Sequence, residues 1–227
     1  EKFEVASGDG SLFLEVVVSP VPRAVPVDPA AQEPPVSGAV CALCWDVTAS
    51  RRLQSKMEAI DRAGQELVRL DSEAIRKMHV TQRLKVLEQK IIRFAHDLLN
   101  FDHFAVRLLD QKSGKLELVM ASGLPSEALE LEFFASRDGS GISGYVAATG
   151  RSYLCPDVAK DRRYVLGLTN ARSSLTVPLL LHDKVIGVFN VESEKPNAFT
   201  EEDRQFAEMF ATHVALALHI LDLLVME

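Results

Sequence analysis

The spacing of hydrophobic residues predicts a helix at each end of the main part of the chain, 79–220. In the first helix, apolar side chains recur at helical spacing on one face, as is typical of a helix that covers a sheet. That face comprises Leu84, Leu87, Ile91, Phe94, Ala95, Leu98 and Leu99. The second helix follows Thr200, whose hydroxyl suits an N-cap, and Asp203 stands three residues later in a capping-box position.

Two strand pairs are predicted between these helices. The first spans 104–110 and 116–122, and the second spans 173–181 and 185–191, with polar turn residues inside each pair. The pattern therefore predicts an α+β domain with an antiparallel sheet and flanking helices.

The residues between the strand pairs alternate between regular and irregular structure. We expect short helix or irregular chain at 127–134, a helix at 142–149, and a strand with its loop at 153–158. Residues 159–171 are polar and either helical or mobile. Irregular chain that covers a sheet leaves gaps with unpaired polar groups, so any ligand is expected between the sheet and 134–175.

The N-terminal residues predict a small separate set of strands. Residues 3–21 are interpreted as two strands joined by a Ser-Gly-Asp-Gly turn, and 40–47 as a third strand. Between them, 20–37 holds six of the ten prolines and few large apolar groups. Such a segment cannot pack a core, so we expect 22–37 to be mobile and dispensable for stability.

A long connecting helix is predicted over 49–78, with Thr48 as its N-cap. Its apolar residues follow the alternating four-three spacing of a heptad seam, with Gly64 and Asp71 as weak layers. The seam comprises Leu53, Met57, Ile60, Gly64, Leu67, Asp71, Ala74 and Met78. A narrow seam favours a parallel coiled coil between two identical chains. The alternative is one helix that lies along its own domain, or a break at Asp71.

Composition narrows the class of protein. The 227 residues are 47% hydrophobic and carry a formal net charge of -7, which argues against a nucleic-acid surface. No apolar run approaches the roughly 20 residues of a membrane span, so no membrane insertion is expected. The chain does not begin with Met, which suggests a piece of a longer polypeptide.

The three cysteines fit a reducing cytoplasm better than a disulfide scaffold. Cys41 and Cys44 form a C-x-x-C within an apolar run that is interpreted as a strand, where positions three apart point to opposite faces. We therefore interpret them as small apolar side chains and not as a zinc or redox pair.

The main part of the chain resembles the GAF domain family through a set of short motifs in the family's order and spacing. These are Gly141-Ile142-Ser143-Gly144, Leu154-Cys155-Pro156-Asp157-Val158, Thr176-Val177-Pro178-Leu179, Val185-Ile186-Gly187-Val188 and Phe199-Thr200-Glu201-Glu202-Asp203. The resemblance implies a regulatory sensor module over 79–222. It also places a ligand pocket beside the helix 142–149 and the strand that follows. The candidate pocket residues are Phe134, Ile142, Tyr153, Asp157, Tyr164 and Ser174.

Residues 1–48 resemble the C-terminal part of a PAS domain. The strand order and the ending Asp46-Val47-Thr48 match the point where PAS domains lead into a signalling helix. The N-terminal strands and pocket helices of that family are absent, which leaves any PAS cofactor in doubt and makes this a truncated or a reduced unit.

Several short stretches match catalytic or ligand-binding motifs in part, and each also has a structural interpretation. Gly139, Gly141 and Gly144 match G-x-G-x-x-G, but no strand precedes them and no acid follows at the required distance. The sequence from His96 to Asn100 fits a loose histidine-kinase phosphoacceptor pattern and is interpreted as the buried end of the first domain helix.

Three further positions match part of a cyclic-nucleotide signature. Lys195, Phe199 and Asp203 are expected to lock a loop to a helix rather than to touch a nucleotide. The functional alternatives for Cys155 are attachment of a bilin chromophore and redox chemistry, but a thiol in an apolar strand is normally inert. No histidine spacing indicates a metal.

The sequence therefore predicts a non-catalytic cytoplasmic sensory module. A PAS-like part over 1–48 and a dimerising helix over 49–78 precede the GAF domain, and 223–227 begin a linker to an output domain. The parent is expected to be a two-component histidine kinase or a related signalling protein that forms a homodimer. The alternatives are a GAF-type redox enzyme acting on a small molecule, or a dimerisation module without a ligand. The sequence names no cofactor.

Overall fold

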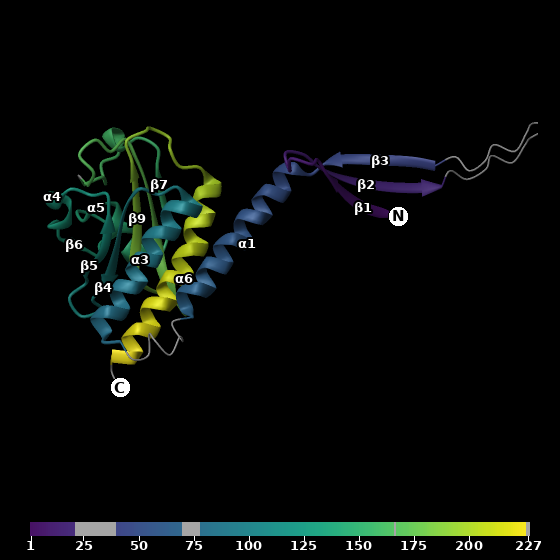
Figure 1. The fold of residues 1–227 in the computed structure, drawn as a ribbon. Helices are drawn as coiled ribbons and strands as arrows, with labels where there is room; N and C mark the ends of the chain where they lie inside the picture. Colours follow the sequence, from purple (N-terminus) through teal and green to yellow (C-terminus); the bar gives the residue numbers. More distant parts are fainter. Residues whose placement is uncertain (21–39, 70–77, 166, 226–227) are drawn as a thin grey trace, which may run out of the picture. The chain divides into compact units, whose positions relative to one another are not determined.

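The computed structural model describes residues 1–20, 40–69, 78–165 and 167–225, which form two compact units, Glu1–Lys56 and Met57–Glu227. Figure 1 shows the helices and strands of each unit. The predicted mobile segment 22–37 lies outside the described residues.

The N-terminal unit is a three-stranded antiparallel sheet in the order β1-β2-β3, as predicted. Its strands are β1 (Lys2–Ala6), β2 (Phe13–Pro20) and β3 (Val40–Asp46). In this sheet Cys41 lies opposite Ser19 and Cys44 lies opposite Val16, so the two cysteines point to opposite faces. The expected placement on opposite faces is confirmed; that the two cysteines are not a zinc or redox pair stays a prediction. That this unit belongs to the PAS family stays a prediction.

Helix α1 (Thr48–Val68) begins one residue earlier than predicted and ends ten residues earlier. The predicted N-cap Thr48 is wrong: its hydroxyl accepts a hydrogen bond from the Phe13 amide (2.9 Å), and Asp46 accepts one from the Thr48 amide (2.9 Å). The hydroxyl oxygen that was expected to cap the helix is thus bonded to the first residue of strand β2. Residues 70–77, which include the seam positions Asp71 and Ala74, lie outside the described residues.

The second unit contains a six-stranded antiparallel sheet in the order β6-β5-β4-β9-β8-β7. Its elements are α3 (Val80–Leu99), β4 (His103–Leu109), β5 (Lys115–Ser122), α4 (Ser126–Leu129), β6 (Phe133–Phe134), α5 (Gly141–Thr149), β7 (Tyr153–Cys155), the 3-10 turn η1 (Val158–Lys160), β8 (Ser173–Leu181), β9 (Lys184–Ser193) and α6 (Glu201–Val225). The predicted strands and helices of this part are confirmed to within a few residues. The predicted linker, 223–227, begins inside α6.

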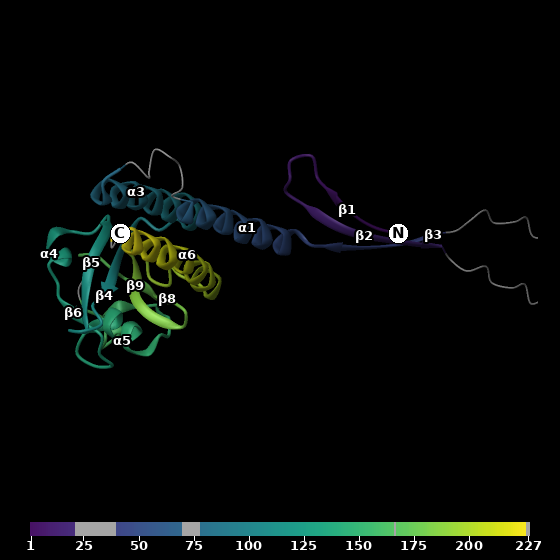
Figure 2. The same cartoon turned by 90° about the horizontal axis from the view of Figure 1, so that it is seen from below.

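Helices α3 and α6 cover one face of this sheet, and α5 lies on the other (Figure 2). In each strand, alternate side chains point toward the first face. Phe104 on β4, Phe189 on β9 and Phe210 on α6 are fully buried there. The rings of Phe189 and Phe210 lie 5.9 Å apart, so strand β9 packs directly on α6. This layer holds most of the hydrophobic core.

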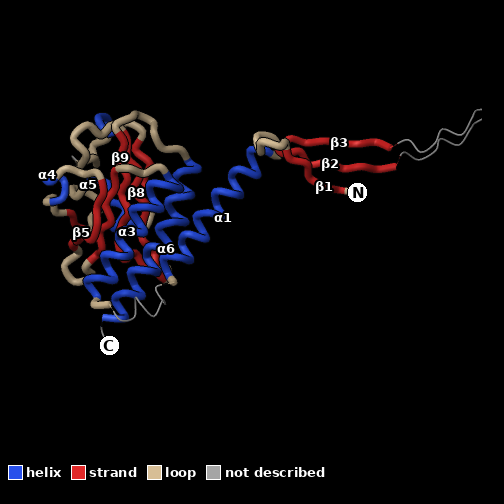
Figure 3. Tube along the Cα trace, viewed as in Figure 1, coloured by secondary structure: helices blue, strands red, loops and turns tan. Residues whose placement is uncertain are grey.

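The part of α1 that belongs to the second unit packs on the same domain. Ile60 and Leu67 are fully buried in the core that α3 and α6 build. Figure 3 shows α1 running beside α6. Gly64 approaches α6 so closely that a Cβ there would lie 2.1 Å from the His213 ring. These are three layers of the predicted seam, so over 57–68 the helix lies along its own domain. Leu53 and Met57, the two seam residues before them, are 37% and 42% exposed.

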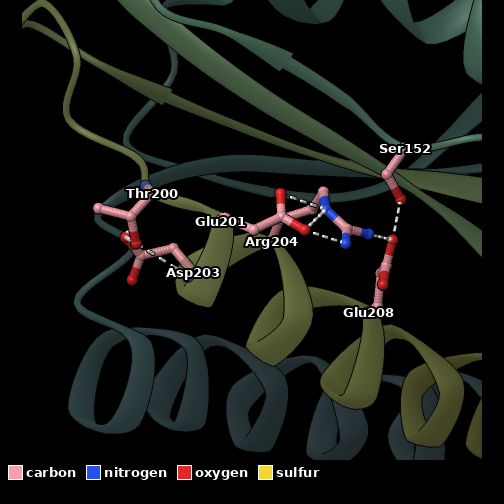
Figure 4. Close-up of polar contacts among 6 residues, drawn as sticks. All are labelled: Ser152, Thr200, Glu201, Asp203, Arg204 and Glu208. Atoms are coloured by element: carbon pink, nitrogen blue, oxygen red, sulfur yellow. Dashed lines mark hydrogen bonds and ion pairs between the residues drawn. The ribbon is translucent and has the colours of Figure 1, made fainter.

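The capping box predicted at the start of α6 is confirmed. The Thr200 hydroxyl accepts a hydrogen bond from the Asp203 amide (3.2 Å), and the Asp203 carboxylate accepts one from the Thr200 amide (2.9 Å) (Figure 4). One turn later the Arg204 guanidinium pairs with Glu201 and Glu208. The network fixes the first turns of the helix.

Within the described residues, no helix is long and apolar enough to cross a bilayer.

Candidate functional site

A small cavity of about 30 Å³ lies between the second face of the sheet and the chain that covers it. It is lined by Ala105, Arg107, Leu124, Ala128, Leu131, Phe133, Ile142, Ser143, Tyr164, Gly167, Ser174, Asn190 and Glu192. Its location matches the prediction that any pocket would form where irregular chain covers the sheet.

Strand alternation makes the floor of this cavity polar. Ser174 lies opposite Glu192, and Thr176 lies opposite Asn190, on neighbouring strands β8 and β9. These residues alternate with the apolar residues that face α3 and α6. Each strand therefore contributes apolar side chains to the core and polar side chains to the cavity.

Arg107, on β4, is the buried cation of the site. It is 5% exposed, and its guanidinium stacks over the Phe133 ring at 4.7 Å. It donates hydrogen bonds to the carbonyl oxygens of Leu131 (3.2 Å) and Ala128 (3.3 Å). Burial lowers the pKa of Arg107 from its ordinary value. The side chain thus holds the segment around α4 against the sheet.

Glu192, on β9, is the buried anion of the site and is 5% exposed. Its carboxylate accepts hydrogen bonds from the Leu168 amide and from the Asn190 side chain (3.3 Å). A Cβ on Gly167 would lie 2.3 Å from this carboxylate, so any larger residue there would require the Glu192 carboxylate to shift. Burial, followed by the charge of Glu192, raises the pKa of Tyr164 well above its ordinary value.

Ser174 has the one side-chain polar atom that is buried without a hydrogen-bond partner among the described residues. The residue is 1% exposed and lines the cavity. Buried polar groups are usually paired, and an unpaired hydroxyl costs about 1–3 kcal/mol. The hydroxyl is therefore available to a guest molecule in the cavity.

Three of the six predicted pocket residues line this cavity: Ile142, Tyr164 and Ser174. Phe134 does not: it is 41% exposed, and its neighbour Phe133 faces the cavity, because adjacent strand residues point to opposite faces.

The other two predicted residues, Tyr153 and Asp157, also lie elsewhere, in contacts that stabilise the covering chain. The Tyr153 hydroxyl donates to Asp161 (2.7 Å). Asp157 accepts from the Ala159 amide (3.2 Å) and pairs with Lys160 (2.8 Å).

Sequence reasoning missed Arg107, Asn190 and Glu192. The signal was present, because each is a polar residue inside an otherwise apolar strand. Asn190 and Glu192 stand two apart and so share one face of β9. A polar residue repeated at that spacing in a buried strand indicates a polar cavity.

The size of the cavity limits what it holds in this conformation. About 30 Å³ accommodates one water, whereas ligand pockets usually measure about 300–1,000 Å³. A larger guest requires the covering chain to move outward. The donors and acceptors that line the cavity suit a small polar molecule.

The structure places the remaining candidate residues outside this cavity. His96 is exposed and not buried as expected, because it lies on the solvent side of α3, where Nδ1 contacts Asp97 (2.9 Å). That hydrogen bond, together with the charge of Asp102, raises the pKa of His96. The described residues contain no group of three His, Cys, Asp or Glu side chains that could hold a metal.

The partial cyclic-nucleotide signature falls in a separate cleft of about 530 Å³, which Lys195, Phe199 and Asp203 all line. Asp203 is engaged in the capping box, and Phe199 stands edge-on to Phe101 with ring centroids 5.8 Å apart. These contacts agree with the expectation that the signature residues stabilise the loop before α6.

Cys155 is 1% exposed, and burial, with the charge of Asp161, raises the pKa of its thiol to about 11. At neutral pH the thiol is therefore protonated, which disfavours nucleophilic chemistry.

Residues 81–219 match the sequence model of a family described as GAF domain. The probable 3',5'-cyclic phosphodiesterase pde-5 of Caenorhabditis elegans is 28% identical over 159 residues, which are 68% of this chain and 21% of that protein. GAF domain-containing protein A of Dictyostelium discoideum is 30% identical over 70 residues, which are 31% of this chain and 44% of that protein. The chain thus spans less than half the length of either relative.

Solved structures with the same fold include two proteins of different kinds. The GAF domain of a phosphoenolpyruvate-protein phosphotransferase from Coxiella burnetii aligns with a TM-score of 0.59 at 17% identity, covering 75% of this chain and 96% of that one. Free methionine-R-sulfoxide reductase from Neisseria meningitidis aligns with a TM-score of 0.57 at 18% identity, covering 76% and 93%. At these identities the likeness shows the fold alone.

Proposed function

Because the chain belongs to the GAF domain family, we propose that it is a non-catalytic sensory module whose ligand is a small polar molecule held in the Arg107–Glu192 cavity. The observation that carries the proposal is the buried, unpaired Ser174 hydroxyl in a cavity that a buried cation, Arg107, and a buried anion, Glu192, also line. Such a floor supplies hydrogen bonds that a guest would complete.

The proposal includes a route from the cavity to the helices. Asn190 and Glu192 face the cavity, while Phe189 and Val191 on the same strand belong to the core against α6. A ligand that shifts β9 would therefore shift α6 as well, because packed cores are bistable rather than continuously deformable. We propose that α1 and α6 carry this shift to an output domain of a signalling protein, a histidine kinase being the expected parent.

We also propose homodimerisation through α1, over a smaller surface than the full seam predicted for 49–78. Ile60, Gly64 and Leu67 are occupied by their own domain, so Leu53 and Met57 are the seam residues within α1 that are left to contact a second chain. A dimer would give the helices the partner that a transmitted shift needs.

A thermal-shift screen of small polar metabolites against the whole chain tests the ligand. The screen includes 3',5'-cyclic nucleotides, because the name of the Caenorhabditis elegans relative concerns that class. A ligand at 100 times its Kd adds about 2.7 kcal/mol, which for a chain of this size raises Tm by about 5–10 °C.

Two variants then locate the binding site of a hit. Ser174→Ala should abolish most of the shift, whereas Thr212→Ala, which removes a hydroxyl from the exposed face of α6, should leave it intact. Equal shifts in both variants would place the ligand elsewhere. If neither the screen nor native mass spectrometry of the purified protein finds a ligand, the dimerisation module is the better reading.

The redox alternative has less support. Cys155 is the single cysteine within 81–219, and its thiol is buried and protonated at neutral pH. The sensor reading predicts that Cys155→Ala retains ligand binding. Turnover of free methionine sulfoxide by the wild type and its loss in that variant would favour the enzyme.

A further inference from the structure

A second pocket, of about 270 Å³, lies on the outer side of α5 and is lined by Arg137, Tyr145, Thr149 and Arg151. Other positions of α5, Ile142 and Ser143, line the central cavity, so the helix separates the two sites. We propose that this outer pocket binds a small phosphorylated molecule carrying at least two phosphoryl charges.

Two arginines give the pocket its charge. Arg137 and Arg151 are exposed, and the ion pairs formed within the described residues include neither. The chain carries a net charge of -7, whereas this pocket carries two unpaired guanidinium groups and is therefore locally positive. Guanidinium groups bind phosphoryl oxygens through paired hydrogen bonds, which carboxamides and ammonium groups do not reproduce.

The wall of the pocket is fixed before any ligand arrives. The Arg163 guanidinium lies 4.8 Å over the Tyr145 ring, and Tyr145 stands edge-on to Tyr153 at 5.6 Å. The Tyr153 hydroxyl is in turn bonded to Asp161. Asp161 is therefore already engaged and does not neutralise the two arginines of the pocket. Because this aromatic wall is already held in place, a compact anion would need to order only the two exposed arginines beside it.

Pyrophosphate is the probe for this site, measured by isothermal titration and by ³¹P line broadening with the whole chain at about 0.15 M salt. The proposal expects a Kd below about 1 mM, and a loss of at least tenfold in affinity for Arg137→Gln and for Arg151→Gln. Arg162→Gln is the matched control, because it removes one exposed positive charge from the neighbouring loop without touching the pocket, and it should change affinity less than twofold. Both pocket arginines are exposed, so their variants should keep the wild-type circular dichroism and Tm.

Three results would overturn the proposal. They are no binding of pyrophosphate at about 5 mM, an equal loss in Arg162→Gln, which would mean diffuse attraction only, and equal affinity for citrate, which would remove the phosphoryl preference. The inference goes beyond the proposed function, and Ser174→Ala should leave pyrophosphate binding unchanged. The two sites can therefore fail separately.

Discussion

Gly64→Ala tests whether α1 packs on its own domain. The new Cβ would lie 2.1 Å from Cγ and Cδ2 of the His213 ring on α6. Ordinary contact between carbon atoms is about 3.5–4.0 Å, so the ring or the helix must move by about 1.5 Å. His213 is not free to turn away without cost, because it is largely buried and its Nε2 lies 3.4 Å from Asp61.

Two opposing effects set the magnitude. Alanine is better than glycine in a helix interior by about 1 kcal/mol, and overpacking costs about 1–3 kcal/mol. In the wild-type background Gly64→Ala should therefore lower the free energy of unfolding by about 0–2 kcal/mol. In a His213→Ala background the obstacle is gone, and the same change should raise it by about 1 kcal/mol. The coupling between the two sites is then about 1–3 kcal/mol.

Urea and thermal unfolding of the wild type, both single variants and the double variant measure this coupling. The expected sign reversal corresponds to a Tm shift of about 2–4 °C per kcal/mol. An identical effect of Gly64→Ala in both backgrounds would refute the packing of α1 against α6. An effect of Gly64→Ala that itself changes with protein concentration would instead indicate that Gly64 lies between two chains.

Four further outcomes follow from the same structure. Thr200→Ala should lower the stability of the domain by about 1 kcal/mol in urea unfolding through loss of the capping box. Gly141→Ala should cost at least about 1 kcal/mol in the same assay, because φ is +69° and a Cβ would lie 3.2 Å from Phe133; Gly8→Ala, with open space around it, should be nearly neutral. The raised pKa of Cys155, about 11, means that its contribution to stability is complete below the unfolded pKa near 9 and is lost as pH rises from there to about 11; Cys155→Ala should flatten that part of the Tm–pH curve. Leu53→Asp or Met57→Asp should convert a dimer to a monomer in light scattering, and a wild type that is monomeric at tens of micromolar would contradict the proposed dimer.

The elements of the GAF domain could be predicted because local pattern and global packing agree there. The strand 104–110 and its partners are short apolar runs bounded by turn residues, and the helices repeat with period 3.6, so each element's type is set within a short window. Whether α1 packs on its own domain or on a second chain could not be predicted in this way. A seam of Ile60, Gly64 and Leu67 suits a second chain and the domain's own α6 equally well, and three-dimensional proximity decides between them.

The location of the pocket was predicted correctly, but only three of the six predicted lining residues line it. The covering segment is irregular, so sequence spacing does not fix which of its side chains turn inward, and Phe133 rather than Phe134 does so. The polar sheet residues, by contrast, are predictable from the sequence. Arg107 and Glu192 stand out as charges within apolar strands, and strand alternation alone assigns them to the face opposite the core.

The polar floor itself argues for a ligand rather than for a dimerisation module. Burying Arg107 and Glu192 removes two charges from water, and the structure joins them to neighbouring groups and not to each other. Replacing buried charges with apolar residues of similar volume is often neutral or stabilising by about 1–4 kcal/mol. A sheet that served only to carry dimerising helices would be at least as stable with an apolar second face, since its first face already supplies the core. Charges kept at that depth, beside a hydroxyl without a partner, are explained if a polar guest completes their hydrogen bonds.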